Sequence, residues 1–161
     1  MYACTHHNLC IEEALQKADL ICKDKGLRFT EIRRKILEMI WASHAPSKAY
    51  DILDKLQNHI SAARPTTVYR SLDFLLENGL IHKLSSLSAY IGCTHPLKHK
   101  NCYFLICSDC GEIKECCDSK LTNSIQLASK QNNFKTKQIT VEIIGTCQNC
   151  KTQIETRLGR S

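Results

Sequence analysis

Two CxxC pairs, Cys107-Ser-Asp-Cys110 and Cys147-Gln-Asn-Cys150, can together supply four thiolates to one metal ion. Cysteines at this short spacing bind the same ion, and four sulfur ligands suit a closed, tetrahedral, structural zinc site. Buried cysteines or a redox-active pair are the alternatives, and the repeated spacing favours zinc. Because residues 111–146 separate the two pairs, the ion is expected to close a small folded domain.

A second group of possible ligands precedes the first CxxC pair. Its members in and beside the segment 93–101 are Cys93, His95, His99 and Cys102. This segment is polar and interrupted by Pro96, so we expect an irregular hinge. Any one of these residues alone is more often a surface histidine or a buried thiol. Together with His82 before the hinge and Glu115 after it, they predict a second metal site drawn from both halves of the chain.

The composition limits the class of protein. The chain has 161 residues, 43% of them hydrophobic, which allows one large or two small domains. It has no apolar stretch long enough to span a membrane, and its first residues do not resemble a signal peptide. We therefore expect a cytoplasmic protein without a membrane partner. In that reducing compartment, eleven cysteines indicate metal ligands and free thiols and argue against a disulfide scaffold.

Residues 11–92 show the pattern of a winged helix-turn-helix domain. Apolar residues at helical spacing predict four helices, with Thr30 and Ser47 as N-caps of the second and third. A β-hairpin then follows. The expected segments are helices over 11–26, 31–41, 47–56 and 63–79 and strands over 80–84 and 89–93. A helical core with an incidental hairpin is the alternative.

The fourth predicted helix carries the candidate DNA contacts. In a winged helix-turn-helix domain this helix enters the major groove with its N-terminal residues nearest the bases. Arg70 is the candidate for base recognition, because a guanidinium can bind guanine O6 and N7 together. The residues expected to contact phosphates or an adjacent groove are Arg64, Thr66, Thr67, Tyr69 and Lys83.

The charge of the chain fits this interpretation without requiring it. The net charge is +6, but acidic and basic residues nearly balance over residues 1–92. A local group of basic residues stands out there: Lys23, Lys25, Arg28, Arg33, Arg34 and Lys35. DNA binding would therefore depend on a few well-placed cations.

The remaining residues predict a small α/β domain over residues 102–152. A strand leads into the first CxxC pair, Ser119 is expected to cap a helix ending near Gln131, and an alternating strand covers 134–146. So small a domain is expected to complete its core by pairing with a second copy. The overall prediction is an α+β fold with a flexible N-terminus over 1–10, a hinge over 93–101 and a loose tail over 153–161.

Over residues 11–152 the sequence resembles the ferric uptake regulator family, most closely its zinc uptake regulator branch. The motifs that carry the resemblance are Leu27-Arg-Phe-Thr30 with Arg33, Ala49-Tyr-Asp51, Arg64-Pro-Thr-Thr-Val-Tyr-Arg70, Leu72-Asp-Phe-Leu-Leu-Glu77, Gly79-Leu-Ile-His-Lys83, Tyr90-Ile-Gly-Cys93 and the two CxxC pairs.

The resemblance implies a homodimeric, metal-dependent repressor with two Zn²⁺ ions per protomer. The four CxxC cysteines would hold the structural ion, and the regulatory ion would be held by His82, Cys93, His99 and Glu115. His95 and Cys102 remain alternatives to His99. Arg28 and Arg33 join the expected DNA contacts. A thiolate ligand favours zinc over iron at the regulatory site.

The expected function is therefore zinc-responsive repression of zinc uptake genes through a palindromic DNA operator, with no small-molecule substrate. An iron-, manganese- or peroxide-sensing regulator of the same family is one alternative. A thiol-redox or zinc-dependent enzyme is an alternative from another class, although four protein ligands would leave no open position for catalytic water.

Overall fold

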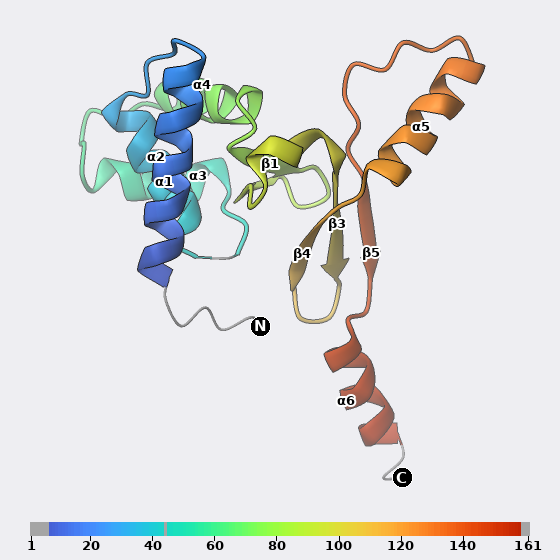
Figure 1. The fold of residues 1–161 in the computed structure, drawn as a ribbon. Helices are drawn as coiled ribbons and strands as arrows, with labels where there is room; N and C mark the ends of the chain where they lie inside the picture. Colours follow the sequence, from blue (N-terminus) through green and yellow to red (C-terminus); the bar gives the residue numbers. More distant parts are fainter. Residues whose placement is uncertain (1–6, 44, 159–161) are drawn as a thin grey trace. The chain divides into compact units, whose positions relative to one another are not determined.

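The computed structural model describes residues 7–43 and 45–158, excluding the side chains of residues 7, 97–99 and 157–158. Figure 1 shows the order of the elements along the chain. The chain divides into two compact units, residues 2–97 and residues 98–161. The predicted α+β class is confirmed, because helices and two small sheets make up the fold.

Four helices form the body of the N-terminal unit, and all four were expected from the sequence. They are α1 (His7–Asp24), α2 (Glu31–Trp41), α3 (Ala49–Gln57) and α4 (Pro65–Glu77). α4 begins at a proline, whose missing N–H is not needed in the first helical turn. α1 is followed by Gly26, whose φ of +64° suits a residue without a side chain. Because α1 begins at His7, residues 7–10 are helical, contrary to the flexible N-terminus predicted over 1–10, and residues 1–6 of that prediction lie outside the described part of the chain.

The core of this unit comes from one apolar stripe on each helix. Each such side chain contributes about 1.5–3 kcal/mol when it is fully buried. The largest fully buried side chains of α2, α3 and α4 are Ile36, Leu37, Ile40, Ile52, Leu56, Val68, Leu72 and Leu75. This packing fixes the opposite, polar face of α4 toward solvent.

The predicted wing is confirmed as a hairpin of β1 (Ile81–Leu84) and β2 (Ala89–Gly92). Ser47 extends it, since its N–H donates to the Tyr90 carbonyl and its carbonyl accepts from the Tyr90 N–H, both at 2.8 Å. The prediction that Ser47 caps α3 was therefore wrong. The N-cap is Lys48, and the Asp51 carboxylate accepts from its N–H at 3.4 Å.

The C-terminal unit contains a three-stranded sheet in the order β4-β3-β5, made of β3 (Cys102–Cys107), β4 (Ile113–Cys117) and β5 (Glu142–Gly145). β4 is antiparallel to β3, and β5 is parallel to it. Helix α5 (Ser119–Gln131) connects β4 to β5. Its cap is Asp118, which accepts from the Lys120 N–H at 2.8 Å, so the expected Ser119 cap was one residue late.

Four other expectations for the second half of the chain were wrong. The strand expected over 134–146 is confined to β5. Of the tail expected to be loose over 153–161, residues 153–158 belong to helix α6 (Gln148–Leu158), which begins inside the second CxxC pair, and residues 159–161 lie outside the described part of the chain. The hinge contains a 3-10 helix, η1 (Pro96–Asn101), where no regular element was expected. Finally, Cys102 and Cys117 form a disulfide, whereas free thiols or metal ligands were expected. Among the described helices, none has the length and apolar character needed to cross a membrane.

Candidate metal centres and nucleic-acid interface

The C-terminal unit brings the four CxxC cysteines together. Their sulfur atoms all lie within 4.8 Å of one another. The Sγ atoms of Cys107 and Cys150 are 3.9 Å apart, and those of Cys110 and Cys147 are 3.7 Å apart. Tetrahedral zinc with Zn–S bonds of about 2.3 Å places adjacent sulfurs about 3.8 Å apart. The donor set and its spacing therefore fit zinc.

Local backbone structure explains how the two pairs meet. Cys107 ends β3, and Gly111, with a φ of +73°, turns the chain back toward β4. Cys147 immediately precedes α6, and Cys150 lies in its first turn. The two segments are joined directly, because the Ser108 N–H donates to the Gly145 carbonyl at 2.9 Å. The parallel pairing of β3 with β5 thus places both CxxC pairs at the same end of the sheet.

Hydrogen bonds prepare Cys107 to act as a thiolate. The backbone N–H of Cys147 donates to its sulfur at 3.3 Å. This bond, followed by one from the Cys110 backbone, lowers the pKa of Cys107 to about 6, although burial opposes the shift. The neighbouring sulfurs, Cys110 first, raise the pKa of Cys150. Without a cation, the cluster therefore favours one thiolate, which is expected for four thiols so close together.

The expected ligands of the second metal site are distributed over both units. In the N-terminal unit, His82 of β1 and Cys93 just after β2 are buried, and their ligand atoms lie within 4.8 Å of each other. In the C-terminal unit, Glu115 lies on β4 and is half-buried. His99 belongs to η1, but its side chain is outside the described part of the chain.

The two alternatives to His99 have other interactions. His95 is exposed, and its Nδ1 lies 2.8 Å from the Thr94 hydroxyl. Cys102 is bonded to Cys117, so in this state it has no thiolate to offer. The disulfide was missed because its two residues are distant in sequence and meet only through the register of β3 and β4.

Helix α4 presents the polar face that was expected to contact DNA. Arg64 at its N-cap, Thr66 and Arg70 are exposed, and Tyr69 is 44% exposed. Thr67 is half-buried. Val68, Leu72 and Leu75 hold the opposite face in the core. The helix is therefore anchored on one side and open on the other, as a recognition helix must be.

The basic group before α4 has a more structural role than the sequence indicated. Arg33 is half-buried, and its guanidinium lies 3.6 Å from the ring centroid of Phe74 on α4. It also donates to the carbonyl oxygen of Arg28, whose own side chain is exposed. Arg34 pairs with Asp19 of α1. The contacts with Phe74 and Asp19 were missed because they join separate helices.

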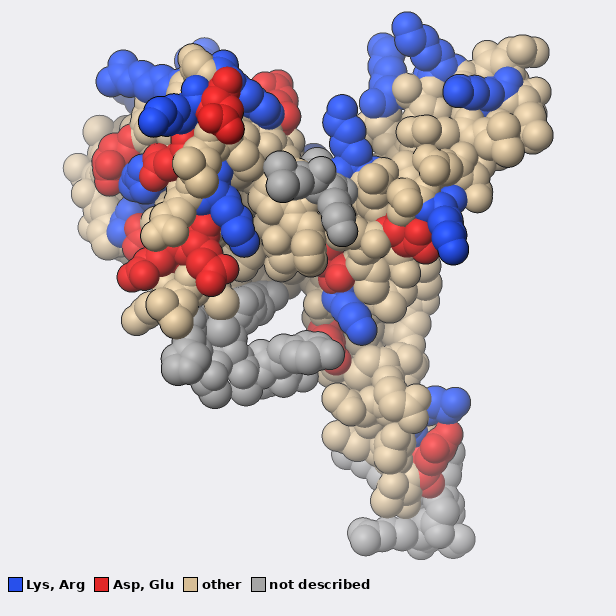
Figure 2. All heavy atoms as spheres, in the orientation of Figure 1, with Lys and Arg blue, Asp and Glu red and all other residues tan. Residues whose placement is uncertain are grey.

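Charges of both signs are interspersed over the visible face of the N-terminal helices (Figure 2). Lysines and arginines alternate there with aspartates and glutamates, and no continuous basic surface is visible on this face.

Known proteins resemble this chain over most of its length. The model of the ferric uptake regulator family matches residues 24–144. The zinc uptake regulation protein of Escherichia coli (strain K12) is 34% identical over 142 residues, which are 86% of this chain and 82% of that protein.

Two solved structures are similar in fold as well as in sequence. A zinc uptake regulator complexed with zinc and DNA has a TM-score of 0.83 at 31% identity, covering 91% of this chain and 97% of the other. Holo XcZur has a TM-score of 0.79 at 35% identity, covering 86% and 96%.

Proposed function

The chain belongs to the ferric uptake regulator family, and from this premise we propose that it is a zinc-responsive, DNA-binding repressor of zinc uptake genes. The observation that carries the choice of metal is the buried pair of His82 and Cys93 on the wing of the DNA-binding unit. A thiolate beside an imidazole favours zinc, whereas oxygen- and nitrogen-rich sites suit iron or manganese. The similarity to a zinc uptake regulator complexed with zinc and DNA supports the same choice.

Two zinc ions per protomer are part of the proposal. Cys107, Cys110, Cys147 and Cys150 would hold the structural ion, which closes the end of the β3–β5 sheet. The regulatory ion would be held by His82, Cys93, His99 and Glu115. When bound, zinc supplies a cross-link between the side chains that ligate it. Because these ligands come from both units, their simultaneous engagement would restrict the hinge that contains η1.

DNA recognition is assigned to α4. Its exposed Arg70 would bind guanine in the major groove, while Arg64, Thr66, Thr67 and Tyr69 would bind phosphates and set the register. Lys83, exposed on the wing, would contact the backbone nearby. A dimer on a palindromic operator needs its two recognition helices at a fixed separation. Restriction of the hinge would therefore lower the ordering cost of DNA binding.

Exposed apolar side chains on the C-terminal unit support a homodimer. Leu127 of α5 is 57% exposed and Ile144 of β5 is 61% exposed. Phe134, between these elements, is 66% exposed. Apolar surface of this kind on a small unit is typical of a subunit interface. As a regulator of transcription, the protein would act in the cytoplasm.

The family assignment excludes one of the two alternative functions considered for this chain and leaves the other open. Membership of a family of regulators rejects the thiol-redox or zinc-dependent enzyme. An iron-, manganese- or peroxide-sensing regulator belongs to the same family and would share α4 and the four-cysteine cluster. It would differ in the metal that activates DNA binding, so that metal is the quantity to measure.

The decisive experiment measures binding of the full-length protein to its operator, found by selection from random duplexes, while free zinc, iron(II) or manganese(II) is varied. We expect zinc to activate binding at the lowest free concentration. Cys93→Ser should lose the zinc response, whereas Cys116→Ser, at a thiol without an assigned ligand role, should retain it. Activation by iron or manganese before zinc, or an unchanged zinc response in Cys93→Ser, would contradict the proposal.

Metal content provides an independent check. Native mass spectrometry should find two zinc ions per chain, one resistant to chelators and one labile. Structural zinc sites contribute on the order of 10 kcal/mol in model peptides, so the resistant ion should be the one held by four cysteines. Cys110→Ser should lose that ion, and His82→Ala should lose the labile one.

A further inference from the structure

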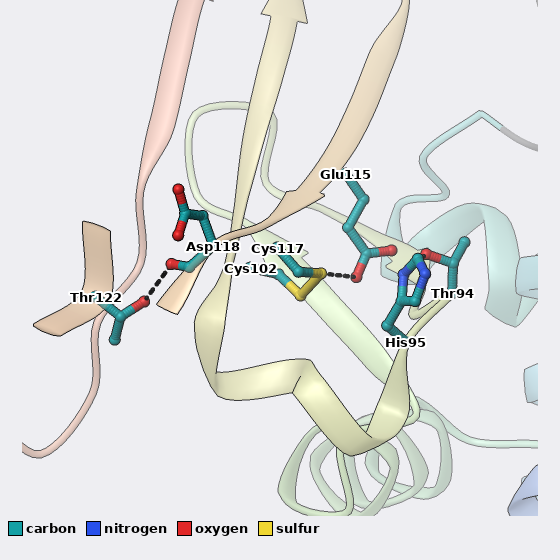
Figure 3. The surroundings of a disulfide bond; sticks show 7 residues. All are labelled: Thr94, His95, Cys102, Glu115, Cys117, Asp118 and Thr122. Atoms are coloured by element: carbon teal, nitrogen blue, oxygen red, sulfur yellow. Dashed lines mark hydrogen bonds between the residues drawn. A yellow bond between two sulfur atoms is a disulfide. The ribbon is translucent and has the colours of Figure 1, made fainter. Parts of the chain in front are cut away.

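The disulfide between Cys102 and Cys117 lies at the end of the β3–β4 pair opposite the four-cysteine cluster. The two residues are register partners, with Cα atoms 3.9 Å apart. Figure 3 shows the disulfide with the Glu115 side chain beside it. The Sγ atom of Cys117 lies 3.9 Å from Oε1 of Glu115. One sulfur of a redox-active pair therefore lies beside a carboxylate to which the proposed function gives a metal-binding role.

We propose that Cys102 and Cys117 are a reversible redox pair that adjusts the affinity of the regulatory zinc site through Glu115. The inference rests on the proposed function in two respects. It takes Glu115 as a zinc ligand, and it takes the cytoplasm as the compartment. Disulfides in that compartment are usually transient and often sense the redox state, because cellular thiols reduce them.

Neither cysteine of the disulfide is fully buried, which leaves room for attack by a reductant. Cys102 and Cys117 are each half-buried, unlike the buried Cys107 at the other end of β3. A thiolate of a small or protein thiol attacks one of the two sulfurs, which breaks the S–S bond and forms a mixed disulfide. A second reductant thiol then attacks the sulfur of the first reductant and releases the protein cysteine, so two external thiols become one external disulfide. Cys102 and Cys117 each gain one electron and one proton.

The redox state of Cys117 changes the hydrogen bonding and the backbone restraint around Glu115. In the disulfide, Cys117 has no proton to donate and fixes the end of β4 to β3, two residues beyond Glu115. After reduction, the Cys117 thiol can donate a weak hydrogen bond to the carboxylate, and the end of β4 loses its covalent restraint. Both changes should weaken zinc binding by Glu115, because the hydrogen bond engages its carboxylate and the lost restraint leaves its strand less fixed. The oxidised protein should therefore bind the regulatory ion more tightly.

Cys116 provides the matched control. It precedes Cys117 on the same strand and keeps its thiol, and it is half-buried in the same way. Because side chains alternate along a strand, it faces the other side of the sheet, where it is paired in register with Tyr103. Its replacement leaves both Glu115 and the disulfide in place.

The experiment equilibrates the full-length, zinc-loaded protein with mixtures of reduced and oxidised glutathione and maps each cysteine by alkylation and mass spectrometry. We expect Cys102 and Cys117 to titrate together, within the range of mixtures that leaves the four-cysteine cluster intact. The affinity for the labile zinc, measured by competition with a chelator, should fall about tenfold on reduction, near the low end of outer-shell effects. Cys116→Ser should behave like the wild type. The double variant Cys102→Ser/Cys117→Ser should show the lower affinity in every mixture.

Three results would overturn the inference. Alkylation of both cysteines in every mixture would show that no disulfide forms, and protection of both in every mixture would show a permanent one. Equal zinc affinity in the oxidised and reduced wild type would remove the link to Glu115, and this result needs no variant. Zinc-activated operator binding in all of these cases would leave the proposed function intact. Its absence in both redox states would instead refute that function.

Discussion

The indole ring of Trp41 occupies the space directly above Gly92. A β-carbon added to Gly92 would lie 2.3 Å from Cε2 of Trp41, closer than two non-bonded carbon atoms can approach. Trp41 ends α2, and Gly92 ends strand β2 of the wing. This contact therefore sets how closely the wing packs on the helical core. Only glycine permits that approach.

Gly92→Ala should consequently destabilise the N-terminal unit. The added methyl group overpacks a site with no space to receive it, which typically costs about 1–3 kcal/mol. The free energy of unfolding can be measured in urea by the fluorescence of Trp41, the only tryptophan in the chain. Gly145→Ala is the control, because a β-carbon there meets nothing within 4 Å. Equal stability of Gly92→Ala and the wild type would contradict the packing described.

The helices of the N-terminal unit could be predicted from the sequence because their signals are local. The apolar residues of α2 recur at helical spacing, and the limits of α4 are marked by Pro65 and the Asn78-Gly79 pair. The four-cysteine cluster could be predicted equally well, since the spacing of each CxxC pair is contained in four consecutive residues. Features that depend only on neighbouring residues, such as helices and CxxC pairs, can therefore be predicted from one stretch of sequence.

Contacts between distant segments could not be predicted in the same way. Ser47 looked like a helix cap, but the backbone of Tyr90 uses its N–H and carbonyl. Cys102 looked like a possible zinc ligand, but the register of β3 and β4 places it against Cys117. In each case two chemically reasonable partners were available. The tertiary fold determines which of the two partners each residue contacts.

The ion pair between Arg34 and Asp19 predicts a separation of stability from DNA binding. Nη2 of Arg34 lies 2.5 and 2.7 Å from the two carboxylate oxygens of Asp19, and this contact raises the pKa of Arg34. The pair is half-exposed, so Arg34→Ala should cost only about 0.5–1 kcal/mol of unfolding free energy and leave operator affinity nearly unchanged. Urea unfolding and operator titration of the same variant measure the two quantities. A large fall in operator affinity at unchanged stability would place Arg34 on the DNA-binding surface.

Arg70→Ala should show the opposite behaviour. Arg70 is exposed, so its loss should leave the urea midpoint unchanged. Its expected contact with guanine should nevertheless make discrimination between operator and non-operator DNA weaker by about 1–3 kcal/mol. Fluorescence anisotropy with both duplexes measures this difference. A loss of stability without a loss of discrimination would remove Arg70 from the recognition surface.

The low pKa of Cys107 predicts a titration in the metal-free protein. The Cys147 N–H stabilises the thiolate, so the pKa falls from an ordinary 9.0 to about 6. The ultraviolet absorbance of the thiolate should therefore rise as the pH passes upward through about 6. Because the pKa is lowered in the folded state, the stability that this group contributes is complete above pH 9.0 and is lost as the pH falls toward 6.

Two variants identify the group responsible for that titration. Cys107→Ser should remove the step, whereas Cys110→Ser should retain it, since the Cys147 N–H still meets the Cys107 sulfur. Circular dichroism over the same pH range verifies that the C-terminal unit remains folded. A step that persists in Cys107→Ser would assign the thiolate to another cysteine.

The stacking of Arg33 on Phe74 predicts how two arginines near the proposed DNA-binding surface differ. Removing one cation that binds a phosphate should reduce the slope of log affinity against log salt by about 1. Arg64 is exposed at the N-cap of α4, so Arg64→Ala should show that reduction for operator and non-operator duplexes alike. Arg33→Ala should leave the slope unchanged but lower the unfolding free energy by about 0.5–1 kcal/mol, because its guanidinium is engaged 3.6 Å from the Phe74 ring. A reduced slope for Arg33→Ala would show that this side chain leaves Phe74 to bind a phosphate in the DNA complex.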